Sequence, residues 1–164
     1  MRKVVQKLIE QHKTISTMES CTGGGVANAI TNIEGASEIL KFSAVTYSNE
    51  FKIKMGVSSD IIDKYSVYSM ETAHEMSRNI SEFTKSDYGV GITGKLNRVD
   101  INNPFGADNM VFISIYDRIK DEYYDSTVEA VLGSRKENKT LVLKEIENML
   151  MNLLTEKKTY QLKK

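Results

Sequence analysis

The chain has 164 residues, the length of one ordinary domain, and 40% of them are hydrophobic while 27% are charged. Lysines and arginines number 22, as do aspartates and glutamates, so there is no net charge to attract nucleic acid or an anionic membrane. The sequence has no apolar run that would span a membrane or act as a signal peptide, and its single cysteine excludes an internal disulfide framework, so we expect a cytoplasmic protein.

The first third of the chain alternates helix and strand patterns. Residues 4–12 place apolar side chains on one helical face, which predicts an amphipathic helix. Residues 14–18 alternate and are rich in β-branched side chains, which predicts a short strand. We then expect a helix over residues 22–32 and a second strand over residues 39–47, buried in its second half.

The middle of the chain is predicted to be mostly helical, with one further strand. Ser48, Ser58 and Ser69 each stand where a helix N-cap is expected. The predicted elements are helices over 51–55, 59–65 and from 70 to about 83, then a strand over 88–93 with closely packing glycines.

The last third begins with a long loop over residues 95–108, which has no hydrophobic periodicity and contains the only proline. Residues 110–116 and 122–131 predict an antiparallel hairpin, and Ser134 is expected to cap a final helix with an apolar stripe. The predicted fold class is α/β, three-layer α/β/α, with a mixed, mostly parallel sheet and helices on both faces. A single domain over residues 1–164 accounts for this order.

The stretch Met18-Glu19-Ser20-Cys21-Thr22-Gly23-Gly24-Gly25 lies between the first predicted strand and the following helix. Glycines allow close backbone approach to a ligand, and a helix start directs unpaired N–H groups and a positive dipole end at it. A nucleophile, an oxyanion hole or a phosphate cradle can be built from these parts. An ordinary glycine-rich turn is the structural alternative.

The two histidines, His12 and His74, lie on predicted helices away from strand ends, so a histidine base is not expected. A lysine can activate a serine instead when its pKa is lowered. If the second strand lies parallel to the first, Tyr47 and Ser20 meet at the carboxyl edge of the sheet, where ligands bind in such folds. Lys52 and Lys54 lie just past the end of the second strand, close after Tyr47, which predicts a Ser-Lys-Tyr group and leaves open which lysine faces Ser20. The alternative is that Lys52 is a solvated helix residue and Tyr47 an edge residue.

Three further residues have both a functional and a structural interpretation. Cys21 is a second possible nucleophile, or a small apolar residue packed under the helix. Arg135, at the start of the last helix, can clamp a phosphate or lie on the surface. Thr93 offers a hydroxyl to a ligand or simply ends a strand. No cysteine and histidine pair has metal-ligand spacing, so no metal site is expected.

The motifs ESCTGGG at 19–25, EGAS at 34–37, VTYSNEFK at 45–52 and MGV at 55–57 resemble, in order and spacing, those of the CinA C-terminal domain family. That family is also known as nicotinamide mononucleotide deamidase, or competence/damage-inducible protein CinA-like. GITG at 91–94 continues the match, which covers nearly the whole chain and is most specific in its first half. With no second domain preceding it, the chain looks like the stand-alone form.

The resemblance implies an amidohydrolase of pyridine-nucleotide salvage, which converts nicotinamide mononucleotide to nicotinate mononucleotide and ammonia. It implies Ser20 as nucleophile, Lys52 as general base and Tyr47 as an aid to proton transfer onto ammonia. Backbone N–H groups of the 21–25 turn would form the oxyanion hole. The implied substrate-binding residues are Cys21, Thr22, Gly23, Gly24, Ser37, Thr93 and Arg135, with Arg135 on the phosphate. No metal or organic cofactor is implied.

The loop after Gly94 departs from the family pattern, which continues there with a glycine- and proline-rich segment. Here the residues are Lys95-Leu96-Asn97-Arg98-Val99-Asp100-Ile101-Asn102-Asn103, so side chains of Lys95, Asn97 and Arg98 are expected where the family offers bare backbone. Two alternatives follow: a catalytically impaired nucleotide-binding or regulatory protein, or an amidase for another amide. The apolar late strands and last helix also suit a homo-oligomer.

Overall fold

The computed structural model describes residues 1–156, so residues 157–164 of the predicted domain lie outside the described residues. The described part contains six α-helices, one short 3₁₀ helix (η1) and five strands. Their bounds are α1 Arg2–Glu10, β1 Ile15–Glu19, α2 Gly25–Thr31, η1 Ala36–Glu38, β2 Ser43–Val45, α3 Asn49–Lys54, α4 Ser59–Tyr65, α5 Met70–Thr84, β3 Tyr88–Gly94, β4 Met110–Asp117, β5 Glu122–Glu129 and α6 Arg135–Thr155.

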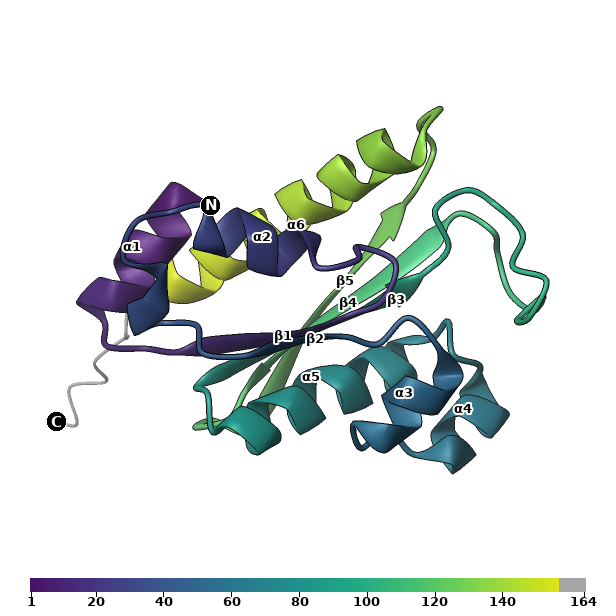
Figure 1. The fold of residues 1–164 in the computed structure, drawn as a ribbon, viewed down its shortest axis with the longest axis horizontal. Helices are drawn as coiled ribbons and strands as arrows, with labels where there is room; N and C mark the ends of the chain where they lie inside the picture. The colour runs from purple at the N-terminus through teal and green to yellow at the C-terminus, as the bar shows by residue number, and fades with distance from the viewer. Residues whose placement is uncertain (157–164) are drawn as a thin grey trace, which may run out of the picture.

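The strands form one sheet in the order β2-β1-β3-β4-β5 (Figure 1). Strands β2, β1 and β3 are parallel, whereas β4 pairs antiparallel with both β3 and β5. This arrangement confirms the predicted mixed sheet and the predicted hairpin. The carboxyl ends of β1, β2 and β3 therefore lie at one edge of the sheet, from which the long loop after β3 extends.

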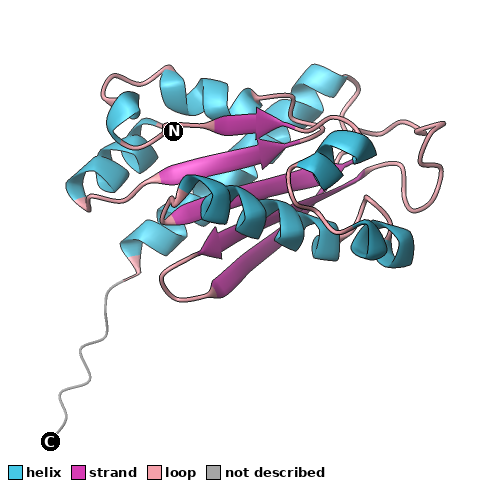
Figure 2. Ribbon diagram, turned by 60° about the horizontal axis from the view of Figure 1, so that its bottom comes forward, coloured by secondary structure: helices cyan, strands magenta, loops and turns pink. Residues whose placement is uncertain are grey.

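Helices cover both faces of the sheet, which confirms the predicted three layers. Helices α1, α2 and α6 lie on one face and α3, α4 and α5 on the other (Figures 1 and 2). Two glycines of β3 allow α5 to lie directly on the sheet. A Cβ at Gly89 would lie 2.0 Å from the carbonyl oxygen of Ser77, and one at Gly91 would lie 2.4 Å from that of Ala73.

The larger hydrophobic core fills the space between the sheet and α1, α2 and α6. The final helix begins with a complete capping box, in which Ser134 and Glu137 bond each other's backbone N–H groups. Its predicted apolar stripe faces this core. Five members are buried (Val142, Ile146, Leu150, Leu153 and Leu154), and two pack against them partly buried (Leu141 and Met149). Within residues 1–156, no helix is both long and apolar enough to cross a membrane.

The strand predicted over residues 39–47 is wrong in its length and burial. Only Ser43–Val45 forms a strand, and residues 39–42 form a turn and irregular chain between η1 and β2. The exposed fractions of Val45 and Tyr47 are 53% and 62%. The physical reason is that β2 is an edge strand, so no further strand covers it. The helix predicted from residue 22 begins at Gly25 because residues 22–24 form a turn.

Candidate active site

Ser20 follows directly after β1, at the edge where the parallel strands end. Its backbone N–H donates to the carbonyl oxygen of Ile92 in β3 at 3.0 Å, which continues the strand pairing by one residue. The chain then reverses through Gly23 and Gly24, whose φ angles are 60° and 88°. Glycine adopts these left-handed values without strain. The turn therefore fixes Ser20 at the carboxyl edge of the sheet.

The carboxylate of Glu19 holds this turn together from inside the protein. Glu19 is fully buried and accepts hydrogen bonds from the hydroxyls of Thr17 and Thr22, at 3.0 and 2.7 Å. It also accepts the N–H groups of Val26 and Ala27, at 2.9 and 3.0 Å. These are first-turn donors of α2, so a protein carboxylate occupies the position that a bound phosphate would take in a cradle.

Sequence reasoning gave Glu19 no separate role. The available signal was a helix start with only glycine at the N-cap position, and Gly24 makes no side-chain cap. A short helix without its own cap requires another acceptor for its first N–H groups. The acidic residue at the end of the preceding strand supplies it.

Lys52 brings a buried ammonium nitrogen to Ser20. Its side chain is 2% exposed, and Nζ donates to Ser20 Oγ at 3.0 Å and to the carbonyl oxygen of Thr46 at 2.8 Å. Burial lowers the pKa of Lys52 to about 8, because the low-dielectric surroundings disfavour its charged form. Lys54 points elsewhere and pairs with Glu50 on the surface of α3. The structure thus brings the predicted serine and lysine together.

The turn also limits which N–H groups can stabilise an oxyanion. The N–H of Gly23 donates to the carbonyl of Ser20 at 2.9 Å, and that of Gly25 donates to the carbonyl of Thr22 at 3.0 Å. Among the turn and loop backbone hydrogen bonds of residues 1–156, none is donated by the N–H of Cys21. Since Cys21 directly follows Ser20, its N–H is the best placed candidate donor.

The thiol of Cys21 lies under the turn, 4% exposed, and is part of the hydrophobic core. Burial raises its pKa to about 12. A thiol with this pKa is almost entirely protonated near neutral pH, and the thiolate is the form that attacks a carbonyl. These surroundings favour the structural interpretation of the thiol and leave Ser20 as the candidate nucleophile.

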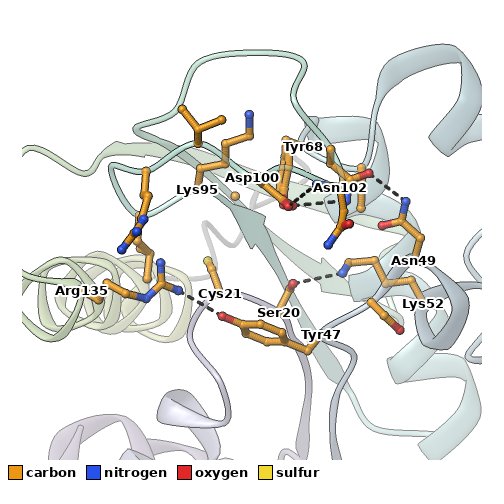
Figure 3. Close-up of a pocket in the computed structure, with 17 residues that line it drawn as sticks. Ser20, Cys21, Tyr47, Asn49, Lys52, Tyr68, Lys95, Asp100, Asn102 and Arg135 are labelled. Carbon is orange, nitrogen blue, oxygen red and sulfur yellow. Dashed lines mark hydrogen bonds between the residues drawn. The ribbon is translucent and has the colours of Figure 1, made fainter.

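Ser20 and Lys52 open into a pocket of about 570 Å³, which is within the usual range for small-molecule sites. Ser20 and Cys21 lie in its centre, with Lys52 on one side and Arg135 on the other (Figure 3). The remaining wall comes from α3, the segment before α5 and the loop after β3. The cavity beside Ser20 is therefore large enough for a small molecule.

Tyr47 lines the pocket with its hydroxyl turned towards Arg135. The guanidinium Nη2 donates to the Tyr47 hydroxyl at 3.1 Å (Figure 3). The ring is 62% exposed. Among the hydrogen bonds of the described residues, none joins Tyr47 to Ser20 or Lys52. The predicted trio therefore consists of a bonded Ser-Lys pair, with the tyrosine at the pocket mouth beside the arginine.

Several predicted substrate-binding residues lie outside the pocket. The hydroxyl of Thr93 is buried and donates to the carbonyl oxygen of Val67 at 2.8 Å, which ties β3 to the segment before α5. Thr22 is engaged by Glu19, and neither Gly23 nor Gly24 lines the pocket. Thr93 therefore supports the structure around the pocket, and Thr22, Gly23 and Gly24 form the turn that carries Ser20.

Ser37 lies at the opposite edge of the sheet from Ser20. It is exposed on η1, next to Ile39, whose carbonyl accepts the N–H of Ile15 at the start of β1. Five strand residues separate that point from Ser20, or about 17 Å at the usual strand rise. Within this chain, Ser37 is therefore too far away to touch a molecule held at Ser20.

The loop after β3 forms part of the pocket wall with its side chains. Lys95 and Arg98 line the pocket as expected, whereas Asn97 is exposed and does not. The ammonium of Lys95 is turned into the loop, where it bonds the carbonyl of Phe105 at 3.0 Å and Asp108 at 3.2 Å. The divergent loop therefore lines the pocket and leaves it open.

No group of three or more His, Cys, Asp or Glu side chains within residues 1–156 is arranged to hold a metal ion. His74 bonds the carboxylate of Asp125, which lies on β5. This pair joins α5 to the edge of the sheet. Neither residue lines the pocket that contains Ser20.

Comparison with known proteins gives a consistent picture. Residues 1–154 match the family model described as the CinA C-terminal domain. A CinA-like protein of Endomicrobium trichonymphae is 35% identical over 159 residues, covering 93% of this chain and 35% of that protein. A putative competence-damage inducible protein of Clostridium beijerinckii is 42% identical over 119 residues, covering 69% and 28%. The chain thus spans about a third of the length of these relatives, or less.

Solved structures of CinA superfamily proteins share the fold. The competence/damage inducible protein CihA of Agrobacterium tumefaciens has a TM-score of 0.82 at 25% identity, over 93% of this chain and 92% of that one. The superfamily protein ECK1530/EC0983 of Escherichia coli has a TM-score of 0.81 at 24% identity, over 93% and 87%.

Proposed function

This chain belongs to the CinA C-terminal domain family, and on that premise we propose that it is an amidohydrolase acting on nicotinamide mononucleotide. The products are nicotinate mononucleotide and ammonia. The observation that carries the proposal is the 3.0 Å contact between Lys52 Nζ and Ser20 Oγ on the floor of an open pocket. A buried lysine with a pKa of about 8 is neutral often enough near neutral pH to act as a base.

In the acylation step, neutral Lys52 takes the proton of the Ser20 hydroxyl while Oγ attacks the carboxamide carbon. The Cys21 N–H faces the oxyanion of the tetrahedral intermediate, and one such donor is typically worth roughly 3 kcal/mol. The Lys52 ammonium then returns its proton to the amide nitrogen. The C–N bond breaks, ammonia leaves, and an ester joins the acyl group to Ser20.

In the deacylation step, water replaces ammonia and the same groups act in the same order. Lys52 takes a proton from water, whose oxygen attacks the ester carbon. The C–O bond to Ser20 then breaks, and the Lys52 ammonium returns the proton to Oγ. The acid product ionises in solution. Lys52 takes and returns one proton in each step, so the cycle restores both Lys52 and Ser20. It requires neither a metal nor an organic cofactor.

The arginine side of the pocket is assigned to the substrate phosphate. Arg135 presents a guanidinium across the pocket from Lys52, and a guanidinium matches phosphate oxygens in a bidentate manner (Figure 3). The hydroxyl of Tyr47 accepts one of its N–H groups and so orients it. In this assignment Tyr47 acts on binding, while Lys52 carries the protons.

The test is product formation by the purified protein. Wild type is incubated with nicotinamide mononucleotide, and with nicotinamide and simple aliphatic amides in parallel, and ammonia and the acid product are quantified. Ser20→Ala protein, prepared identically, measures any contaminating amidase. We expect release of both products from the mononucleotide by wild type alone. Binding of the mononucleotide without turnover would instead support a non-catalytic nucleotide-binding protein, and turnover confined to a non-nucleotide amide would support another amidase.

A further inference from the structure

Asp100, in the loop after β3, presents a fixed carboxylate to the pocket. It is half-buried, and its Oδ1 accepts the backbone N–H of Asn102 at 2.9 Å. Its Oδ2 accepts the side-chain amide of Asn103 at 3.3 Å and the hydroxyl of Tyr68 (Figure 3). Asn103 is in turn bonded by Asn49, at the start of the helix that carries Lys52. The carboxylate is therefore held at a defined place.

The groups that hold Asp100 carry no charge, so they position its carboxylate without neutralising it. The ion pairs found in the described part of the chain do not include Asp100. The Tyr68 hydrogen bond also lowers the pKa of the Asp100 carboxyl, because that bond favours its ionised form. An ionised carboxylate on a pocket wall without a paired cation attracts a positively charged ligand.

The cations of the pocket are not paired with Asp100. Arg98 lines the pocket from the same loop, but it is exposed and forms no ion pair with Asp100 among the described residues. Lys52 is close enough for Asp100 to counteract the lowering of its pKa, yet Lys52 must be neutral to act as a base. Lys95 is paired with Asp108 inside the loop, at 3.2 Å. Arg135 bonds Tyr47 on the far side of the pocket (Figure 3). The space beside Asp100 and Ser20 thus favours a cation at the moment of catalysis.

Building on the proposed amide hydrolysis, we propose that Asp100 selects amide substrates that carry a fixed positive charge on the ring bearing the carboxamide. An N-substituted pyridinium has that charge next to the scissile amide. Hydrolysis turns the neutral carboxamide into a carboxylate, which Asp100 repels, so the same residue also favours product release.

The experiment compares two ligands that differ only in ring charge. The Ser20→Ala protein, which binds without turnover, is titrated calorimetrically with nicotinamide mononucleotide and with its reduced, neutral-ring dihydro form. Both carry the same phosphate, so Arg135 affects them equally. We expect the cationic form to bind about tenfold more tightly. In Ser20→Ala/Asp100→Asn that ratio should fall to about one through weaker binding of the cationic form alone.

Asp63→Asn in the same background is the matched control. Asp63 is exposed on α4 and does not line the pocket, so this substitution removes the same charge at a site away from the ligand. It should leave the ratio unchanged. If Asp100→Asn disturbs the loop, Asp100→Ser removes the charge with a smaller side chain. An unchanged ratio in a folded Asp100 variant overturns the proposal, as does binding of neither ligand. Turnover by wild type is scored separately, so failure of the amidohydrolase assignment would be seen on its own.

Discussion

The Lys52 ammonium nitrogen lies 3.0 Å from the Ser20 hydroxyl oxygen, although 32 residues separate them in sequence. Parallel pairing of β1 with β2 produces this contact, since Glu19 lies opposite Val45 and both strands end at the same edge. The next residue on the β2 side, Thr46, accepts the second hydrogen bond of Lys52 Nζ. Lys52 is thereby held between a backbone carbonyl and the serine that it is proposed to deprotonate.

The pH dependence of catalysis should follow the neutral form of Lys52. Its pKa is lowered by burial to about 8, and only the neutral amine accepts the Ser20 proton. We therefore expect kcat/KM to rise about tenfold from about pH 7 to about pH 9 and then level off. Initial rates of ammonia release at low substrate concentration measure this, with melting temperatures confirming a folded enzyme throughout. A flat or falling profile would contradict the assignment.

The same burial should make stability depend on pH. The folded pKa of Lys52 is about 8 and the ordinary value is 10.5, so the unfolded chain binds more protons between these values and the free energy of unfolding rises with pH there. Relative to Lys52→Met, wild type should gain about 2 kcal/mol between about pH 7.5 and about pH 9.5. Urea unfolding at both pH values measures the difference in the free energy of unfolding between wild type and each variant. Lys54→Met, at an exposed position, should show a constant gap; equal behaviour of both variants would refute the prediction.

Glu19→Gln should destabilise the turn that carries Ser20. The carboxylate accepts four hydrogen bonds, two at each oxygen, whereas a glutamine amide has one acceptor oxygen and would direct an NH₂ group at bound donors. We expect a loss of roughly 1–3 kcal/mol in the free energy of unfolding, with lower activity. Glu50→Gln, on the exposed face of α3, should change stability by less than about 0.5 kcal/mol. Similar effects of the two substitutions would remove the structural role given to Glu19.

Tyr47→Phe separates substrate binding from proton transfer. The Tyr47 hydroxyl bonds Arg135, so its loss should loosen the arginine and raise KM for the mononucleotide about fivefold, with kcat within about threefold of wild type. Steady-state kinetics with varied substrate provide both constants. A large fall in kcat at unchanged KM would instead support the role implied by the resemblance, transfer of a proton to the leaving ammonia.

The sequence was sufficient to predict the position of Ser20 and its partner. Its strand-to-helix turn followed from a change of hydrophobic periodicity, and the shared edge with Tyr47 and Lys52 followed from the rule that parallel strands end together. Both are local patterns combined with a topological rule. By position alone, Lys52 and Lys54 both lie just past the second strand. The resemblance implied Lys52, and the structure places its Nζ beside Ser20 Oγ.

The remaining features depend on packing between segments far apart in the chain. The shortness of β2 follows from its edge position, which residues 39–47 do not encode locally. The four-donor environment of Glu19 requires α2 to begin directly above it. Asp100 meets Tyr68 only because the loop after β3 lies against the segment before α5. The resemblance implied Ser37 as a substrate-binding residue but not where it lies. The pairing of Ile39 with Ile15 places it at the edge of the sheet opposite Ser20.

The central claim, that Ser20 and Lys52 act as one unit, is tested most directly by a double-mutant cycle. Ammonia release from nicotinamide mononucleotide is measured for wild type, Ser20→Ala, Lys52→Met and the double variant. Each single substitution should lower kcat/KM by at least about a thousandfold, and the double variant should be no slower than Ser20→Ala. A Ser20→Ala protein that retains the wild-type rate, or losses that multiply in the double variant, would contradict it.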